Sequence, residues 1–499
     1  MNKKSQLFKN VISGFGGQLI AIILGLIVPR FFIMSYGSDV NGLLSTITQI
    51  FTYMALLEAG IGQAAKNLLY KPFQEKDKDK ISETYSVAKT YFGRFTFIYG
   101  IGVIAIAFIL PFTLKTNVDN LTIALIVLFE GMSGVVSFYF VETPSIIIGV
   151  DGKNYVNNSI TLISRIAGYI VKIVMAALGL NVVLLQFVFF IVTIAKVFFY
   201  QIYFKKHYSW IKFKKTSKDI KLKDRNSYII IEITSTVFNS TDMIILSVFV
   251  STQLSSVYGI YNMVFSNLTL LLNSVYFSVV YLLGYSYHDS KEKYIHLHDT
   301  FNSVFLGTIT ILMMVCYFLT IPFVSLYTKG VTDTNYIYTS LPLLFCFVQM
   351  LSWSRFVGGN LIGVAGRVKK AVWVNVLEAV INLTCSVIFV QKFGIVGVLF
   401  ATVIALLPKV IYCNYVGDRI ILKRSCWNTI KILGTNFILF FAVVLIKPYI
   451  HIDVNSYLSF AVYGIGLSVL FTVIVMAVNS LLNPHMLKNG LALIKNRKA

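Results

Sequence analysis

Charged side chains are scarce in this chain of 499 residues. Only 13% of the residues are Asp, Glu, Lys or Arg, while 57% are hydrophobic, well above the roughly 45–50% of a soluble globular domain. The segments Ile173–Ala195 and Met243–Tyr287 contain no charged residue at all. A helix needs about 20 apolar residues to cross a bilayer, and its backbone satisfies its own hydrogen bonds there. The composition therefore predicts an all-α integral membrane protein.

The sequence also lacks what an energy-consuming or synthetic enzyme needs. It contains no G-x-x-x-x-G-K-[ST] loop, and its longest predicted polar connection, 204–227, is too short for a nucleotide-hydrolysing domain. No predicted outward loop is long enough for the catalytic segment of a membrane polymerase or ligase. We expect no enzymatic activity, no catalytic residue and no cofactor. Transport driven by an ion gradient, membrane potential or mass action of the substrate remains.

Cysteine is also sparse. The five cysteines all lie in the second half of the chain and show no C-x-x-C spacing, so burial as small apolar side chains explains them without disulfides or a metal. His296, His298 and Asp299 lie together in a polar connection, which a solvated turn explains as well as a metal site does. We predict no metal site.

Apolar runs separated by polar breaks predict about 14 transmembrane helices. If the amino terminus is cytoplasmic, the inward connections contain 31 Lys and Arg residues and the outward connections contain four, as the positive-inside rule requires. Both termini are then cytoplasmic. The net charge of +22 belongs mainly to one membrane face. The basic run Lys205–Arg225 is therefore expected to lie on anionic membrane lipids rather than on nucleic acid.

Two similar signatures indicate an internal repeat. IGVDGK at 148–153 and IGVAGR at 362–367 both end an apolar run, 214 positions apart. In each, the last glycine is expected to form a tight turn and the basic residue to hold that turn at the inner surface. We predict two parallel six-helix bundles with a substrate site between them. The predicted domains are the bundles 1–203 and 228–417, the basic cytoplasmic linker 204–227, and two additional helices with a basic tail in 418–499.

The first hundred residues resemble a known family. The stretch FKNVISGFGGQLIAIILGLIVPRFFIMSYGSDVNGLLSTITQIFTYMALLEAGIGQAA (Phe8–Ala65), followed by YKPFQEKDKDKISE, is similar to the polysaccharide-transporter branch of the multidrug/oligosaccharidyl-lipid/polysaccharide exporter superfamily, the Wzx-type flippases. The resemblance implies a MATE-like V shape that alternates between inward and outward openings.

The resemblance also implies a function. Such a protein moves an undecaprenyl-pyrophosphate-linked oligosaccharide to the outer leaflet of a bacterial cytoplasmic membrane, for capsule, exopolysaccharide or O-antigen synthesis. Its candidate partners are this lipid-linked substrate, a polysaccharide polymerase and other assembly proteins.

Basic residues inside the predicted spans suit an anionic cargo, because intramembrane charges are costly and indicate function. Arg165 and Lys172 are two helical turns apart on one face of span 155–179. We predict that they bind the anionic headgroup, since Arg contacts phosphate bidentately and Lys acts as a point charge. Further substrate-binding candidates are Arg30, Arg94 and Arg355. Structural ion pairs with intramembrane acids explain these residues equally well, and those acids are Glu58, Glu130, Glu142, Glu232, Asp242 and Glu378.

Glu130 and Asp242 lie away from the predicted span ends, where a carboxylate can bind a coupling proton or Na+. The alternative function is an ion-coupled exporter of amphiphilic cations on the same architecture. In that case the acids bind the cargo and the basic residues are structural. The intramembrane basic residues, above all Arg165 and Lys172, discriminate between the two functions.

Overall fold

The computed structural model describes residues 3–213, 225–450 and 452–482, and regular structure there is entirely helical. Eleven described helices are long and apolar enough to cross a membrane. Two of them, in 22–55 and 369–421, each cover two predicted spans, and α7 contributes the shorter apolar segment Ser240–Phe249. The prediction of an all-α, multi-pass membrane protein with about 14 spans is confirmed.

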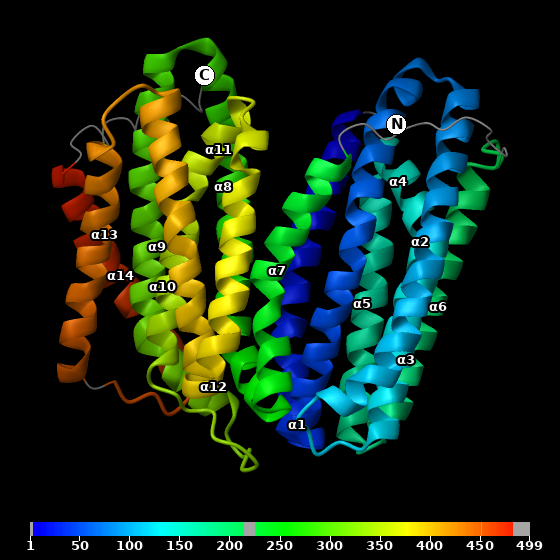
Figure 1. Cartoon of the computed structure of the whole chain (residues 1–499), viewed down its shortest axis with the longest axis horizontal. Coiled ribbons are helices and arrows are strands. Elements are labelled where there is room, and N and C mark those ends of the chain that lie inside the picture. Colours follow the sequence, from blue (N-terminus) through cyan, green and yellow to red (C-terminus); the bar gives the residue numbers. More distant parts are fainter. Residues whose placement is uncertain (1–2, 214–224, 451, 483–499) are drawn as a thin grey trace. The chain divides into compact units, whose positions relative to one another are not determined.

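The chain folds into two compact units, Met1–Val257 and Tyr258–Ala499, and Figure 1 labels their helices. The first unit contains α1 (Lys3–Glu75), α2 (Lys78–Thr113), α3 (Asn120–Phe140), α4 (Glu142–Val150), α5 (Asn154–Ala177), α6 (Val182–His207), α7 (Arg225–Phe249) and the start of α8 (Thr252–Asp289). The second contains the rest of α8, α9 (Lys291–Tyr327), α10 (Leu341–Ser354), α11 (Phe356–Val364), α12 (Val368–Tyr415), α13 (Trp427–Ile446) and α14 (Tyr457–Leu482).

The domain boundaries drawn from the repeat stay a prediction. Within the first unit, α7 packs along α1, although the repeat pattern assigns α7 to the second bundle. Residues 214–224 of the predicted basic linker, and 483–499 of the predicted basic tail, lie outside the described residues.

Glycines break the two longest helices into pairs of arms. In α1 the backbone leaves the helical region at Gly37, with φ 81°, and in α12 it does so at Gly394, with φ 54°. Only glycine adopts such positive φ values without strain. The arms of α12 run antiparallel, since the Asn382 amide donates to Thr402 Oγ1 over 2.9 Å and the rings of Phe389 and Phe400 lie 5.9 Å apart.

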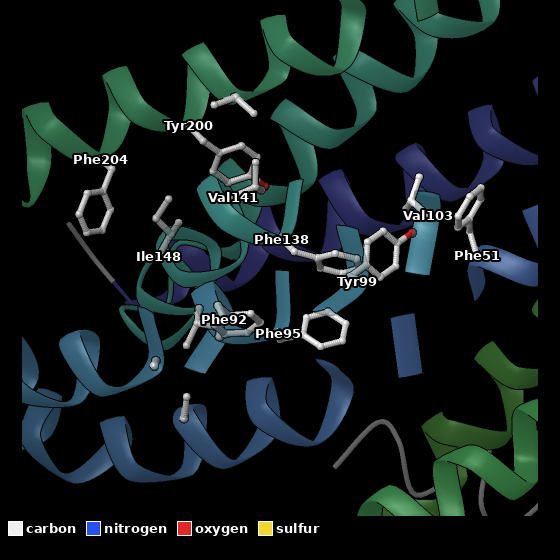
Figure 2. Close-up of a cluster of buried hydrophobic side chains, with 14 of the residues drawn as sticks. Phe51, Phe92, Phe95, Tyr99, Val103, Phe138, Val141, Ile148, Tyr200 and Phe204 are labelled. Atoms are coloured by element: carbon white, nitrogen blue, oxygen red, sulfur yellow. The ribbon is translucent and has the colours of Figure 1, made fainter. Parts of the chain in front are cut away.

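The core of the first unit is aromatic. Phe138 on α3 meets the edges of Phe95 and Tyr99 on α2, with ring centroids 5.2 and 5.0 Å apart. Figure 2 shows this cluster together with residues of α1, α4 and α6. A Cβ added to Gly134 would lie 2.5 Å from the Tyr99 hydroxyl, so the glycine lets α3 approach α2. Edge-to-face pairs of this kind add about 0.5–1.5 kcal/mol each to the burial of the rings.

The beginning of α8 is fixed to the first unit. Asp39 accepts hydrogen bonds from the Thr116 hydroxyl over 2.9 Å, from the Asn117 backbone amide over 2.8 Å, and from the Thr252 hydroxyl. A Cβ added to Gly42 would lie only 1.7 Å from the carbonyl oxygen of Thr252. The α1 backbone therefore lies directly against the first turn of α8, which only a glycine permits.

In the second unit, α9 is central and contacts α10, α13 and α14. Trp353 of α10 is fully buried and packs edge to face with Phe305 of α9, 5.4 Å away. The two last helices are joined by an amide pair, because Asn436 on α13 and Asn479 on α14 exchange hydrogen bonds of 3.2 Å. Reciprocal amide bonds satisfy polar groups that would otherwise be costly inside a membrane.

Both repeat signatures form the predicted tight turns. Gly152 has φ 76° and Gly366 has φ 67°, and each ends a nine-residue helix, α4 or α11. In the first turn, Lys153 lies 2.7 Å from the Asp151 carboxylate. Burial alone would lower the pKa of Lys153, but the hydrogen bond and charge of Asp151 outweigh it and raise that pKa. The expected role of the glycines is confirmed.

Candidate functional site

The first unit contains a cavity of about 330 Å³ between the two arms of α1, α5 and α7. This volume is at the lower end of ligand pockets in proteins. One side of it is apolar, and the other carries hydroxyl and amide groups. Its described lining residues are Val28, Pro29, Phe32, Asn41, Leu44, Ser45, Thr48, Gln49, Tyr169, Lys172 and Met243.

Lys172 is the one charged side chain among these lining residues. Its Nζ lies 4.0 Å from the ring centroid of Phe189 on α6 and 6.0 Å from that of Phe32 on α1. The negative faces of aromatic rings attract a cation, the more so where water is excluded. Gly168, one turn before Lys172, leaves room for Phe189, since a Cβ there would lie 2.7 Å from that ring.

Behind Lys172 lies a carboxylate that does not line the cavity. Glu130 on α3 interacts electrostatically with Lys172 and accepts a hydrogen bond from the amide of Gln186 on α6. Gln186 is 1% exposed. The described residues give its Oε1 atom no hydrogen-bond partner. Gln186 thus binds one oxygen of Glu130, and the Lys172 ammonium lines the cavity.

A second charged cluster surrounds Glu142, the first residue of α4. Glu142 interacts electrostatically with Lys196 on α6 and with Lys66 on α1, and Lys196 interacts with Arg165 on α5. Arg165 is exposed, while Lys66, Glu142 and Lys196 are half-buried. Among the described side chains, none lies within ion-pair distance of Glu142. Two cations interact with this acid, and Arg165 adds a third positive charge beside Lys196.

Arg165 and Lys172 therefore do not share one cluster. Seven residues of helix rise by about 10.5 Å. On one face of α5, Arg165 therefore lies at the Glu142 cluster, and Lys172 lies about two turns further along, at the cavity. Of the other substrate-binding candidates in this unit, Arg30 is half-buried beside the cavity-lining Pro29, and Arg94 is exposed on α2. Neither lines the cavity.

Asp242, the second coupling candidate, is 5% exposed on α7. It interacts electrostatically with Tyr53 on the second arm of α1. The Tyr53 hydroxyl also donates to the carbonyl oxygen of Val237 over 3.1 Å and contacts the Thr241 hydroxyl. The structure does not bring Asp242 together with Glu130. Two other acids of the predicted set, Glu58 and Glu232, lie outside the described side chains.

The second unit contains a closed ion triad. Glu378 on the first arm of α12 pairs with Arg355, which lies at the break between α10 and α11, through one oxygen. Its other oxygen lies 2.5 Å from the Nζ of Lys409 on the second arm. The Glu378 side chain is 2% exposed, whereas those of Arg355 and Lys409 are 14% and 16% exposed. Arg355 is thus held in an ion pair, and the triad has two cations and one carboxylate.

The two units place their charges at matching positions. Glu142, Arg165 and Lys196 are each followed 213 positions later by a member of the second triad, namely Arg355, Glu378 and Lys409. The first member lies at a helix break in both units. Lysine is kept, while the acid and the arginine exchange places. Both triads thus have two cations and one carboxylate.

His298 and Asp299 belong to another ion cluster rather than to a solvated turn. Arg424 donates to both oxygens of Asp299, over 2.8 and 2.7 Å, and to Asp418 over 2.7 Å. His298 is buried and its Nδ1 lies 3.1 Å from Asp299. The cluster joins the beginning of α9 to the segment before α13. Within the described residues, no group of three His, Cys, Asp or Glu side chains is placed to hold a metal ion.

Sequence reasoning missed the polar wall of the cavity. Asn41, Ser45 and Thr48 follow each other at helical spacing on the second arm of α1. This periodicity marks a polar stripe in an otherwise apolar span, and it was present in the sequence. Glu142 was among the predicted intramembrane acids, but its meeting with Lys66 gave no signal, because it depends on contacts between α1 and α4.

No protein-family model matches the sequence, and no curated protein matches it. Solved structures do match the fold. The lipid II flippase MurJ in an inward closed conformation has a TM-score of 0.68 and 17% identity, over 93% of this chain and 98% of that one. An inward-facing multidrug resistance MATE family transporter of the MOP superfamily has a TM-score of 0.65 and 13% identity, over 81% and 94%.

A third match is a MOP superfamily transporter from Pyrococcus furiosus, described by the reverse polarity of its binding pocket. It has a TM-score of 0.58 and 12% identity, over 85% of this chain and 98% of that one. At sequence identities of 12–17%, the similarity to these structures shows a shared fold alone. The chain is a multi-pass membrane protein with the fold shared by MurJ and the MATE transporters of the MOP superfamily.

Proposed function

We propose that the protein is a flippase that moves an undecaprenyl-pyrophosphate-linked oligosaccharide from the inner to the outer leaflet by alternating access. The observation that carries the proposal is the cavity of the first unit. Its described lining has one charged residue, Lys172, beside the hydroxyl and amide groups of α1. A cation attracts phosphate, and hydroxyl and amide groups exchange hydrogen bonds with sugars. The cavity thus matches the polar head of a lipid-linked saccharide.

The Glu142 cluster supports the same cargo. Lys66 and Lys196 interact with one carboxylate and Arg165 lies near Lys196, and such an excess of cations is costly in a membrane unless an anion balances it. A diphosphate diester carries two negative charges and suits such a surplus. We place Arg165 and Lys172 at two successive stations for the headgroup on α5. Arg30, Arg94 and Arg355 remain candidates for other contacts along the path.

The proposal includes the setting. We place the protein in the cytoplasmic membrane of a bacterium with both termini in the cytoplasm, where it serves capsule, exopolysaccharide or O-antigen synthesis beside a polymerase and other assembly proteins. MurJ, which shares the fold, is described as a lipid II flippase. That likeness supports the proposed class of cargo.

The competing function is export of amphiphilic cations, which the MATE matches support. A cation exporter needs carboxylates that face its cavity. Here no described lining residue is acidic, and Glu130 is held behind Lys172 by Gln186. The polarity of the cavity therefore favours the flippase.

The test is transbilayer movement of a fluorescent undecaprenyl-diphosphate oligosaccharide in proteoliposomes. Intact protein is compared with Lys172→Met, which removes the charge and keeps most of the length of the side chain, and with Arg165→Ala. The matched control is Lys329→Ala, because Lys329 is an exposed basic residue in a loop between helices. We expect Lys172→Met to reduce movement at least tenfold, Lys172→Arg to restore part of it, and the control to be unchanged.

The same vesicles test the alternative. An intact protein that moves no lipid-linked saccharide but exports a cationic dye along an ion gradient would overturn the flippase. If intact protein and Lys172→Met are both folded and move the lipid-linked saccharide at equal rates, the cavity has no part in flipping.

A further inference from the structure

The triad of the second unit has one cation more than a structural ion pair needs. Glu378 and either Arg355 or Lys409 would form a neutral pair. The first unit also has two cations and one acid at the matching positions, so this composition occurs in both units.

The exposed fractions show which charges an arriving molecule meets. The carboxylate of Glu378 is almost fully covered, while Arg355 and Lys409 each keep part of the side chain accessible. The two cations bind opposite oxygens of one carboxylate. An anionic oxygen pair held by a guanidinium on one side and an ammonium on the other is also how these groups hold a phosphate.

We infer that Arg355 and Lys409 form a second binding site for a phosphate or diphosphate group, and that Glu378 fills this site as a built-in anion when no ligand is bound. The ligand displaces the carboxylate from its two cations. The open cluster around Glu142 is the unoccupied form of the same arrangement. The inference takes the class of anion from the proposed function, but the site is defined by binding and not by transport.

The test measures binding of inorganic pyrophosphate, read as the shift in thermal unfolding of the purified full-length protein in detergent. Glu378→Gln removes the competing charge and keeps the shape of the side chain. We expect it to bind pyrophosphate about tenfold more tightly or better than intact protein, since it removes a like charge at contact distance. The triple variant Glu378→Gln/Arg355→Gln/Lys409→Gln should lose the gain in pyrophosphate affinity. As a control for the first unit, Glu142→Gln is added to a protein that carries Arg355→Gln and Lys409→Gln, and it should not restore that gain.

Glu378→Gln leaves two cations unbalanced and can prevent folding. Glu378→Asp is the second variant, because it keeps the charge and withdraws it by one methylene, so a smaller gain in pyrophosphate binding is expected. If neither variant gains affinity for the anion, Glu378 is a structural partner only and the inference is wrong. If both gain it but the vesicles show no flipping, the site stands and the proposed function fails.

A second arm separates the two sources of the anion. Mixed micelles of detergent with a long-chain isoprenyl diphosphate are compared with micelles that carry the isoprenyl alcohol. Tighter binding of Glu378→Gln to the diphosphate lipid and to inorganic pyrophosphate identifies the phosphate group itself as the ligand. Tighter binding to the diphosphate lipid alone assigns the site to a lipid headgroup. Equal binding of diphosphate and alcohol lipids to both proteins contradicts the inference.

Discussion

Glu378 and Lys409 are 31 positions apart on α12, yet the Nζ of Lys409 lies 2.5 Å from a carboxylate oxygen of Glu378. The break at Gly394 makes this possible, because it folds the two arms of α12 against each other. Arg355 completes the arrangement from the end of α10. Three elements of the second unit are therefore joined by one carboxylate.

The triad predicts a charge-swap experiment. Arg355→Glu alone or Glu378→Arg alone leaves like charges in contact, and each should lower the free energy of unfolding by about 3–5 kcal/mol. The double swap reproduces the order of charges in the first unit, so about 2–3 kcal/mol should be recovered relative to additivity. Unfolding in mixed detergent at several denaturant concentrations measures both effects. A double variant as unstable as the sum of the singles would show that the triad tolerates one order only.

The ring of Phe189 should set the position of Lys172. A cation–π contact is worth about 1–2 kcal/mol where water is excluded. Phe189→Leu removes it, which lets the ammonium turn toward Glu130 and should lower transport efficiency by roughly fivefold to tenfold. Phe189→Tyr keeps the ring and should stay near the intact value. Initial rates of flipping over a range of substrate concentrations decide this, and equal losses for Leu and Tyr would point to packing alone.

Glu130 and Asp242 carry the coupling proposal. Neutralising a carboxylate that binds the driving ion removes its differential affinity for the two access states. Glu130→Gln or Asp242→Asn should therefore leave flipping that no longer responds to an imposed proton or Na+ gradient. Asp453→Asn, in an exposed loop, is the control and should respond normally. Transport and ion dependence that survive in both variants would exclude coupling through these residues.

Gly42 should be the least replaceable glycine of α1. Gly42→Ala forces a Cβ against the backbone of Thr252 and should cost about 3 kcal/mol or more. Gly25→Ala on the same helix has nothing within 4 Å of the new Cβ, so it should be neutral or stabilise by up to about 1 kcal/mol. Thermal unfolding of the two variants side by side measures the difference. Similar midpoints would mean that the beginning of α8 moves away from α1 without loss.

The sequence was sufficient for the features that depend on local pattern. Hydrophobic length predicted the number of spans, and the glycines of the two signatures predicted the turns at Gly152 and Gly366. The breaks at Gly37 and Gly394 fall between predicted spans, but no local pattern shows that each pair of arms continues in one long helix.

The candidate site was predicted only in part, because its chemistry depends on which helices are neighbours. Lys172 was expected to contact a ligand and does line the cavity. Its partners Phe189 and Gln186 come from α6 and have no marked spacing in the sequence. Arg355 was predicted as a substrate contact and is found in a pair with Glu378. The sequence alone left open whether Arg355 contacts the substrate or forms a structural ion pair, because a sequence gives no distances between helices.

The two-armed form of α12 also bears on how this protein enters the bilayer during synthesis. A lone Glu or Lys within an inserting helix is costly. Because Glu378 and Lys409 lie on arms joined by one short break, the arms can leave the translocon as a helical hairpin whose opposite charges are already neutralised. The break at Gly394 then shapes membrane insertion as well as the finished fold.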